Sequence, residues 1–530
     1  SVVCLFDGEV VPLDLGDVPV GRTTRGHRFL APGEISVENA AEYAEKLARA
    51  YVVADADERR LRIESELQRC AVLAGVIARP DPALLDEVTG LAEFPVVLAG
   101  TIDAGFMSLP PEVLATAMRT HQKYFACEHA DGSLAANFLF VANNIGDAET
   151  IVAGNERVLR ARLADARFFW DQDRKTRLED RVAALKERVY HDKLGSVFDK
   201  VARMERLAGF LGEYVPGASA AQRAVRLAKA DLSTAMVGEF PELQGVMGRY
   251  YARHDGEAEA VAQAIAEHYK PLGPSDDCPT QPTSIVAALA DKIDTLAAFF
   301  AIGEKPTGSR DPFALRRAAQ GVIRIVLENR LRLPLAAAFE HAHRTLAPKY
   351  PDPTADVLAF VVERLKVHLR DQGFRHDLIA AALARAGERE DDLLRLRHRV
   401  EALHEFVGSE TGANLLITYR RASNIVAIEQ RKDRRQYDGS VDRDLLAQPE
   451  EQKLLARLDE AGQRASAELA RDVFEAAIAE LAQLRRPVDE FFEKVTVNTD
   501  VAELRENRLR LLSRIRATMN LVADFSQIEG

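Results

Sequence analysis

From Gly154 to the end of the chain, strand-like alternation nearly disappears and apolar residues recur at helical spacing. The segment GNERVLRARLADARFFWDQD at 154–173 shows this spacing, and so do IVAALADKIDTLAAFFAIG at 285–303 and FALRRAAQGVIRIVLENRL at 313–331. With 530 residues, 47% of them hydrophobic and 29% charged, the chain is too long for one core and too apolar to be disordered. We therefore expect a predominantly α, multidomain protein.

Residues 1–150 differ because they mix strand and helix signals. Two β-prone runs flank Asp131-Gly132 within 124–144, which predicts a β-hairpin. Ahead of it, SLPPEVLATAMRTHQ places Ser108 near a cap and two prolines where a missing N–H costs little, which predicts a helix. His121 continues the apolar positions of that helix, so we expect a core histidine rather than a general base. The region is predicted to be α/β.

Charge and cysteine content restrict the kind of protein this is. The net charge of -12 argues against a chain coated with nucleic acid, so any RNA contact must be a local basic patch. Four scattered cysteines show no zinc-ligand spacing, and no apolar run approaches the ~20 residues that span a bilayer. We expect a cytoplasmic protein without zinc or membrane contact. Because the chain starts at Ser1 instead of Met, we also expect that it was cut from a longer one.

The loop EKPTGSRDPFALRRAAQG at 304–321 could hold a phosphate or could simply start a helix. A Walker-type cradle needs G-x-x-x-x-G-K-[ST] after a strand, whereas PTGSRDP follows a helix and lacks that spacing. Asp311 and Pro312 instead fit the N-cap and first position of a helix. The sequence therefore predicts a helix start, with Arg316 and Arg317 either against RNA phosphates or on a solvated, salt-bridged face.

The C-terminal segment RENRLRLLSRIR at 505–516 carries five arginines against one glutamate. At 100° per residue, one wide apolar face forms from Leu504, Leu509, Leu511, Leu512, Ile515 and Met519. Arg508 falls inside that face, which predicts a paired structural arginine. Arg510 and Arg514 fall on the opposite side with Asn507 nearby, where they could meet RNA or solvent.

Several longer segments together carry a family resemblance. They are KADLSTAMVGEFPELQGVMGRYYARHDGE at 229–257, EHYKP at 267–271, ALADKIDTLAAFFAIGEKPTGSRDPFALRRAA at 288–319, HQKYF at 121–125 and the segment at 154–173. Over essentially its whole length, the chain resembles the β subunit of the bacterial heterotetrameric glycyl-tRNA synthetase. The N-terminal segment of that family is expected to be missing here.

The resemblance implies four regions. Residues 1–150 would form an α/β region similar to the B3/B4 part of the phenylalanyl enzyme's β subunit. Residues 151–335 would form a helical domain of the HD-phosphohydrolase type, and 336–410 a helical linker. Residues 411–530 would form a DALR-type anticodon-binding helical domain.

The sequence can test the HD part independently. An HD metal site needs a His-Asp doublet with a further His and Asp. The doublet position holds Ala230-Asp231, followed by His268 and Asp291, and the first metal histidine falls near Lys193 or Leu194. With these imidazoles missing, the resemblance implies a scaffold that has lost its hydrolase chemistry and binds no metal.

The function implied by the resemblance is that of a tRNA-binding subunit. It would recognise tRNA(Gly) and support ATP-dependent glycylation by an α subunit in an α2β2 assembly. ATP and Mg are expected on the α subunit and no cofactor on this chain, which has no class II, HIGH, KMSKS, GxSxG or HExxH pattern and no catalytic residue. Alternatives are an HD-type metal-dependent nucleotide phosphohydrolase and a helical scaffold without an RNA role. Candidate tRNA contacts are Asn507, Arg510, Arg514, Lys123 and Arg316.

Overall fold

The computed structural model describes residues 2–346, 350–384 and 390–529. Helices make up most of the fold, as predicted, and the chain divides into two compact units. Unit 1 comprises Ser1–Leu185 and Lys229–Ala258, and unit 2 comprises Lys186–Ala228 and Glu259–Gly530. Each unit therefore takes its residues from two separate segments. Among the described helices, none is long and apolar enough to cross a membrane.

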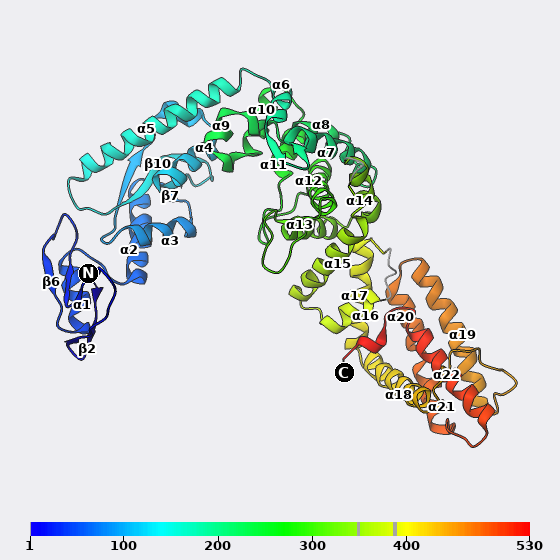
Figure 1. The fold of residues 1–530 in the computed structure, drawn as a ribbon. Coiled ribbons are helices and arrows are strands. Elements are labelled where there is room, and N and C mark those ends of the chain that lie inside the picture. The colour runs from blue at the N-terminus through cyan, green and yellow to red at the C-terminus, as the bar shows by residue number, and fades with distance from the viewer. Residues whose placement is uncertain (1, 347–349, 385–389, 530) are drawn as a thin grey trace. The chain divides into compact units, whose positions relative to one another are not determined.

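Unit 1 contains a four-stranded antiparallel sheet (Figure 1). Its strand order is β7 (Ile77–Ala78), β9 (Phe125–Glu128), β10 (Leu134–Ala142) and β8 (Val96–Thr101). Strands β9 and β10 form the predicted hairpin. At its turn Gly132 has φ of 81°, and the Asp131 carboxylate accepts a 2.9 Å hydrogen bond from the Ser133 N–H. The hairpin prediction is confirmed.

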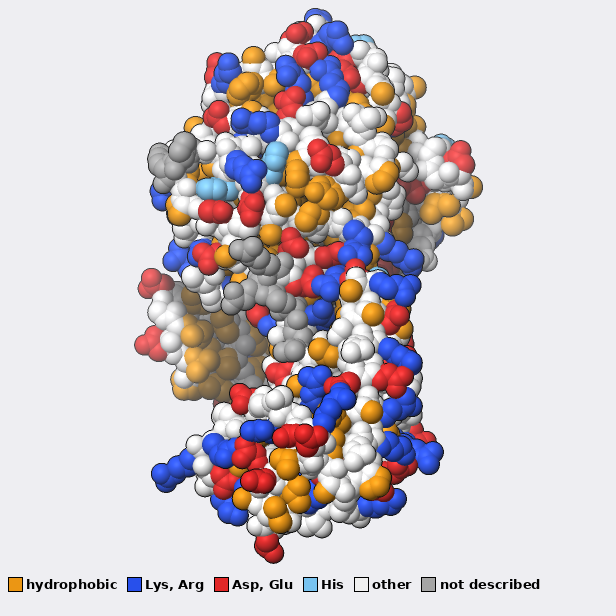
Figure 2. All heavy atoms as spheres, turned by 90° about the vertical axis from the view of Figure 1, so that its right-hand side faces the viewer, with side chains coloured by type: hydrophobic (Ala, Val, Ile, Leu, Met, Phe, Trp, Pro, Cys, Tyr) orange, Lys and Arg blue, Asp and Glu red, His pale blue; other side chains and the backbone are white. Residues whose placement is uncertain are grey.

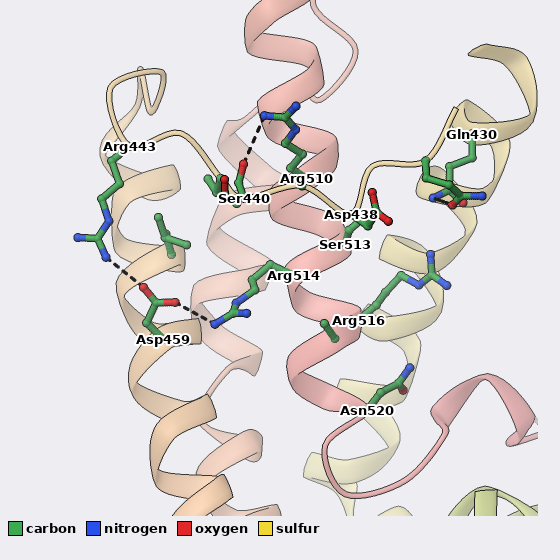
Figure 3. Close-up of a pocket in the computed structure, with 15 residues that line it drawn as sticks. Gln430, Asp438, Ser440, Arg443, Asp459, Arg510, Ser513, Arg514, Arg516 and Asn520 are labelled. Carbon is green, nitrogen blue, oxygen red and sulfur yellow. Dashed lines mark hydrogen bonds and ion pairs between the residues drawn. The ribbon is translucent and has the colours of Figure 1, made fainter. Parts of the chain in front are cut away.

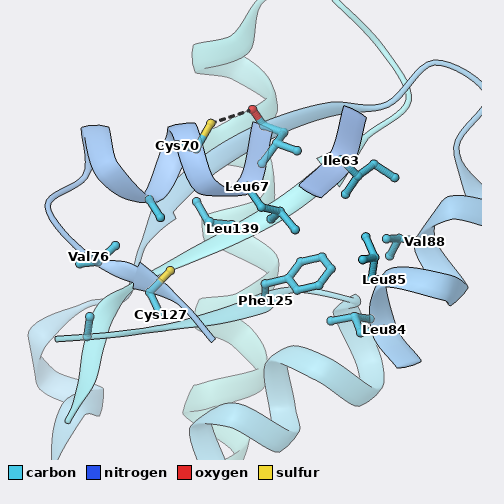
Figure 4. Close-up of a cluster of buried hydrophobic side chains, with 13 residues drawn as sticks. Ile63, Leu67, Cys70, Val76, Leu84, Leu85, Val88, Phe125, Cys127 and Leu139 are labelled. Atoms are coloured by element: carbon cyan, nitrogen blue, oxygen red, sulfur yellow. Dashed lines mark hydrogen bonds between the residues drawn. The ribbon is translucent and has the colours of Figure 1, made fainter. Parts of the chain in front are cut away.

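One face of the sheet packs against α2 (Ala56–Leu73) and α3 (Pro82–Leu91) through a buried hydrophobic cluster (Figure 4). Leu139 belongs to this cluster, whereas its neighbour Phe138 lies on the opposite face, as strand alternation requires. Phe138 stacks on Tyr124, with ring centroids 4.7 Å apart. It also crosses Gly100, where a Cβ would lie only 2.4 Å from the ring, so only glycine fits there.

In the described part of the chain, six short strands and helix α1 precede α2. Strand β1 (Val2–Val3) pairs in parallel with β4 (Val20–Gly21), while β2 (Leu5–Phe6) pairs with β3 (Glu9–Val10) and β5 (Thr23–Arg25) with β6 (Glu34–Ser36). Helix α1 (Ala40–Arg49) follows and is capped by Asn39.

The helix predicted before the hairpin is shorter and less regular than expected. Ser108 ends a 3₁₀ turn, η1 (Ala104–Ser108), and helix α4 (Pro111–Thr116) begins after Pro110. A π-helical turn, η2 (Ala117–Gln122), then widens the helix. The prediction of a core His121 is wrong, because the wider turn breaks the 3.6-residue spacing and leaves His121 exposed, with its ring 5.5 Å from that of Phe240.

Buried Asp173 joins the two chain segments of unit 1. It ends the long helix α5 (Ala148–Asp173), and its carboxylate accepts hydrogen bonds from the N–H groups of Ala235 (3.0 Å) and Met236 (2.9 Å). These are the first residues of α9 (Ala235–Glu239), whose N-terminus favours a negative charge. Tyr251 of α10 (Val246–His254) donates to the same carboxylate at 3.0 Å. The remaining short elements are α6 (Leu178–Arg181), η3 (Val182–Glu187), η4 (Ala230–Ser233) and η5 (Pro241–Leu243).

Unit 2 is organised around α12 (Pro282–Ala301), which is buried along most of its length. Around it lie α7 (Val197–Leu211), α8 (Ala221–Leu227), α11 (Glu259–Glu267), α13 (Leu315–Glu328), α14 (Leu335–Arg344) and α15 (Thr354–Asp371). Strands β11 (Val189–His191) and β12 (Gly195–Ser196) form a short hairpin before α7. Asp294 of α12 is buried between two cations of α7, Arg203 at 2.7 Å and Lys200 at 3.1 Å. Removing one of these cations would leave the buried charge of Asp294 less compensated, which would destabilise the fold.

The loop before α13 starts a helix, but three residues later than predicted. Asp311 does cap α13 with its side chain, whose oxygens accept from the N–H groups of Leu315 (2.8 Å) and Arg316 (2.9 Å). Pro312 stays outside the helix, and Ala314 has a left-handed φ of 53°. The loop folds back on itself, so Asp311 reaches N–H groups four and five residues ahead. The sequence therefore predicts the capping residue correctly but places the start of the helix three residues too early.

The C-terminal part of unit 2 is a helical bundle. It contains α16 (His376–Ala384), α17 (Leu393–Gly408), α18 (Glu410–Asp433), α19 (Pro449–Ala470), α20 (Phe474–Ala482), α21 (Arg485–Lys494), α22 (Ala502–Met519) and η6 (Phe525–Gln527). Helix α22 contacts both α18 and α19, so its sides face different partners.

Candidate nucleic-acid interface

The predicted apolar face of α22 is confirmed. Leu509, Leu511, Leu512, Ile515 and Met519 are all fully buried, and Leu504 is half-buried at the start of the helix. Because this face packs against α18 and α19, the helix is fixed in rotation. That rotation decides which of its arginines can be reached from outside.

Arg508 is the paired structural arginine that its position predicts. Its Nε donates to the carboxylate of Glu451 at 2.7 Å, and Nη1 donates to the carbonyl of Thr496 at 2.8 Å. Glu451 is fully buried and also accepts from the N–H of Gln448 (2.7 Å), which caps α19. Both charges therefore belong to the core of the bundle rather than to a ligand site.

The placement of Asn507 on the exposed side of α22 is wrong. Its side chain is buried and makes two hydrogen bonds with the backbone of Asp442, accepting at 2.8 Å and donating at 2.8 Å. The cause lies outside the helix, since the loop at 434–448 between α18 and α19 covers this side of α22. Asn507 thus anchors a loop and is not accessible to RNA.

Arg510 and Arg514 reach the surface, but each is paired. Arg510 binds Glu506 at 2.6 Å and the carbonyl of Ser440 at 3.3 Å, while Arg514 binds Asp459 of α19 at 3.3 Å. The Arg514 side chain is 50% exposed and that of Arg510 is 32% exposed. Ion pairs this exposed are worth little and exchange readily for another anion.

The two arginines line a pocket of about 610 Å³ (Figure 3). Its lining includes four arginines against two aspartates, which leaves a net charge of +2. Figure 3 shows Arg443 and Arg514 converging on Asp459, while Arg510 reaches Ser440 in the loop. Elsewhere, on the face drawn in Figure 2, basic and acidic side chains alternate instead of gathering in a single-sign patch. The pocket is therefore a local basic site on an acidic chain.

Two other sequence candidates lie elsewhere. Lys123 belongs to unit 1, where it has a left-handed φ of 58° directly after the π-helical turn and binds Glu87 at 2.8 Å. Arg316 at the start of α13 donates to the carbonyl of Gly308 at 2.6 Å, which holds the preceding loop. Neither residue lines the pocket beside α22.

Comparison with known proteins identifies the family. A family model described as glycyl-tRNA synthetase beta subunit matches residues 1–384, and one described as DALR anticodon binding domain matches residues 415–528. The chain belongs to the glycyl-tRNA synthetase beta subunit family. Glycine–tRNA ligase beta subunits from Rhodospirillum centenum and Phenylobacterium zucineum are 49% and 48% identical to it. Each match covers 100% of this chain and 78% of the relative.

The anticodon-binding match of this synthetase subunit contains the whole pocket beside α22. The sequence had indicated the arginines of α22, but it had missed Asp438, Arg443 and Ser513. The Asp438-Gly439 turn signal between α18 and α19 was present, yet a turn alone does not reveal which helix it folds onto. The loop is held against α22 by the Asn507–Asp442 hydrogen bonds, by the hydrogen bond from Arg510 to the Ser440 carbonyl and by the Arg435–Glu506 ion pair.

The residues at the HD ligand positions are engaged in other contacts in this synthetase subunit. Asp231 accepts from the N–H groups of Gly245 (2.5 Å) and Gly248 (3.1 Å), and burial raises the pKa of its carboxyl to about 6. His268 has its Nδ1 2.7 Å from the carbonyl of Ile265, and Asp291 pairs with Lys200 at 3.3 Å. Within the described residues, no group of three or more His, Cys, Asp or Glu side chains could hold a metal ion.

Proposed function

We propose that this chain is the tRNA-binding β subunit of a glycine–tRNA ligase, which recognises tRNA(Gly) and supports its ATP-dependent glycylation by a partner α subunit. The observation that carries the proposal is the pair of family matches, which together cover residues 1–384 and 415–528. The basic pocket beside α22 lies within the second match and supports a focused RNA contact.

In this proposal Arg510 and Arg514 contact the phosphate backbone of the anticodon stem and loop. Both side chains reach solvent, and each is held by a half-buried carboxylate with which a phosphate can compete. Phosphate contacts position an RNA without reading its sequence, so these arginines would supply affinity rather than specificity. Lys123 and Arg316 remain candidates for contacts with other parts of the tRNA.

The partner subunit would supply the adenylation chemistry, with ATP and Mg bound there, and we propose an α2β2 assembly in the cytoplasm. We further propose that residues 1–150 form a B3/B4-like region and 151–335 an HD-like scaffold, followed by a linker at 336–410 and the anticodon-binding domain at 411–530. The contacts of Asp231, His268 and Asp291 do not support the phosphohydrolase alternative.

Aminoacylation with separated subunits tests this function. Purified chain, partner α subunit, ATP, Mg, labelled glycine and tRNA(Gly) should together give glycyl-tRNA, and each subunit alone should not. A tRNA for another amino acid serves as the control RNA. If the chain neither bound tRNA(Gly) nor increased charging by the α subunit, the proposed function would be wrong.

A further inference from the structure

One carboxylate in the pocket beside α22 stands out because it has no partner. Asp438 is exposed, and it has no hydrogen bond or ion pair with any described residue, although four arginines line the same pocket. The second aspartate, Asp459, pairs with Arg443 and Arg514. The pocket therefore combines cations with one acceptor that is free to bind something else.

The segment that carries Asp438 is held in place from both sides. Tyr437 is buried, and its hydroxyl donates to Asp433. On the other side, the Ser440 carbonyl accepts from Arg510, and Asp442 is fixed by Asn507. Between them, Gly439 lies against the Arg510 guanidinium, where a Cβ would be 3.2 Å from Nε. Asp438 is thus presented to the pocket by an anchored turn rather than by a free loop.

Further polar atoms of the pocket also lack partners. The Ser513 Oγ and the Arg516 Nε are buried and make no hydrogen bond with the described residues. Buried polar atoms usually find a partner in the protein or in a bound molecule. Both residues belong to α22 and line the pocket with Asp438, so a ligand there could satisfy all three.

The chemical class of such a ligand follows from the combination of four arginines with one unpaired carboxylate. Arginines alone would suit a bare phosphate, but an unpaired carboxylate repels an anion and accepts from a neutral donor. A nucleotide combines both requirements, since its phosphate is anionic and its base edge can carry an amino group. Single-stranded loops present unstacked bases to proteins, and Asp accepts from the exocyclic amine of cytosine.

We propose that this pocket binds one unstacked cytosine of the anticodon loop and that Asp438 determines specificity by accepting a hydrogen bond from its N4 amine. Every glycine codon begins with two guanines, so the anticodon of a glycine tRNA carries two adjacent cytosines. The inference rests on the proposed function and deepens it by assigning base readout to Asp438. Arg510 and Arg514 hold the adjoining backbone.

The test uses the full chain and an anticodon hairpin of tRNA(Gly), with each cytosine replaced in turn by uracil or by 2-pyrimidinone, which lacks the amine. For one of the two positions, wild type should bind the cytosine hairpin about 5- to 150-fold more tightly than either analogue. Asp438→Ala removes the acceptor and should reduce this ratio to near one, whereas an amide would still accept from the amine. Asp444→Ala, on the same exposed loop but outside the pocket, is the matched control and should keep the full ratio.

The outcomes separate the two proposals. If wild type bound the hairpin but Asp438→Ala kept full discrimination at both positions, base readout by Asp438 would be overturned and tRNA binding would stand. Discrimination lost equally in Asp444→Ala would overturn it too, because only the charge of the loop would matter. If wild type failed to bind the hairpin at all, the proposed function would fail as well.

Discussion

Neighbouring arginines on α22 have opposite environments, and this difference can be measured. Arg508→Ala would leave Glu451 buried without its cation, which typically costs about 3–5 kcal/mol. We expect a correspondingly lower free energy of unfolding for the bundle, measured with denaturant. Replacing Arg508 and Glu451 together by Met and Leu should cost less than the single change. Equal losses from the single and double variants would mean that the buried pair is not the source of the effect.

Arg510 and Arg514 should affect RNA affinity instead of stability. In the double alanine variant we expect weaker binding of tRNA(Gly) with an unchanged unfolding curve, because both side chains lie outside the apolar face of α22. On a single strand each phosphate contact contributes about -0.7 to the slope of log K against log salt, so the slope should flatten by about 1.4. Fluorescence titrations at several salt concentrations measure this. An unchanged slope would place the phosphate contacts elsewhere.

At the scale of elements, the buried carboxylate of Asp231 accepts hydrogen bonds from the N–H groups of Gly245 and Gly248 at the start of α10. Its pKa is raised from 3.8 to about 6, so the folded state binds the proton more tightly than the unfolded state. The stabilising contribution of the protonated form is present below pH 4 and is lost as the pH rises through about 6. The loss amounts to about 3 kcal/mol, because one pKa unit corresponds to about 1.4 kcal/mol.

The effect of pH on unit 1 should therefore depend on Asp231. The single tryptophan, Trp170, stacks on Tyr251 of α10 at 5.5 Å, so its fluorescence reports unfolding at this place. Between pH 4 and 6, wild type should lose stability relative to Asp231→Asn, and Asp444→Asn should follow wild type. Parallel pH profiles for wild type and Asp231→Asn would contradict the expected linkage.

The sequence predicted those elements whose signals are local. The hairpin at 124–144 and the apolar face of α22 follow from turn chemistry and periodicity within a few residues. Asn507 was misplaced because the loop that buries it comes from 65 residues earlier, at Asp442. His121 was misplaced because a π-helical turn has no clear sequence signal. Neither the burial of Asn507 nor the exposure of His121 can be predicted from residue spacing along the chain alone.

At the scale of the whole molecule, the chain should be inactive in adenylation without its partner. It has no class II, HIGH or KMSKS pattern among its 530 residues. We expect no ATP–pyrophosphate exchange with glycine from the purified chain and exchange once the α subunit is added. The α subunit alone is the control that shows how much of the exchange depends on this chain. ATP–pyrophosphate exchange by this chain alone would refute the proposal that the adenylation site lies on the α subunit.

Lys229–Ala258 belong to unit 1, although the residues before them, 186–228, belong to unit 2. This order along the chain has a consequence for folding during synthesis on the ribosome. When Leu185 has been made, the carboxylate of Asp173 still lacks the N–H groups of Ala235 and Met236 and the hydroxyl of Tyr251. The first unit therefore cannot complete its fold as it emerges, although domains generally fold in order from the N-terminus. Its final contacts form only after residues 186–228, which belong to unit 2, have left the ribosome exit tunnel.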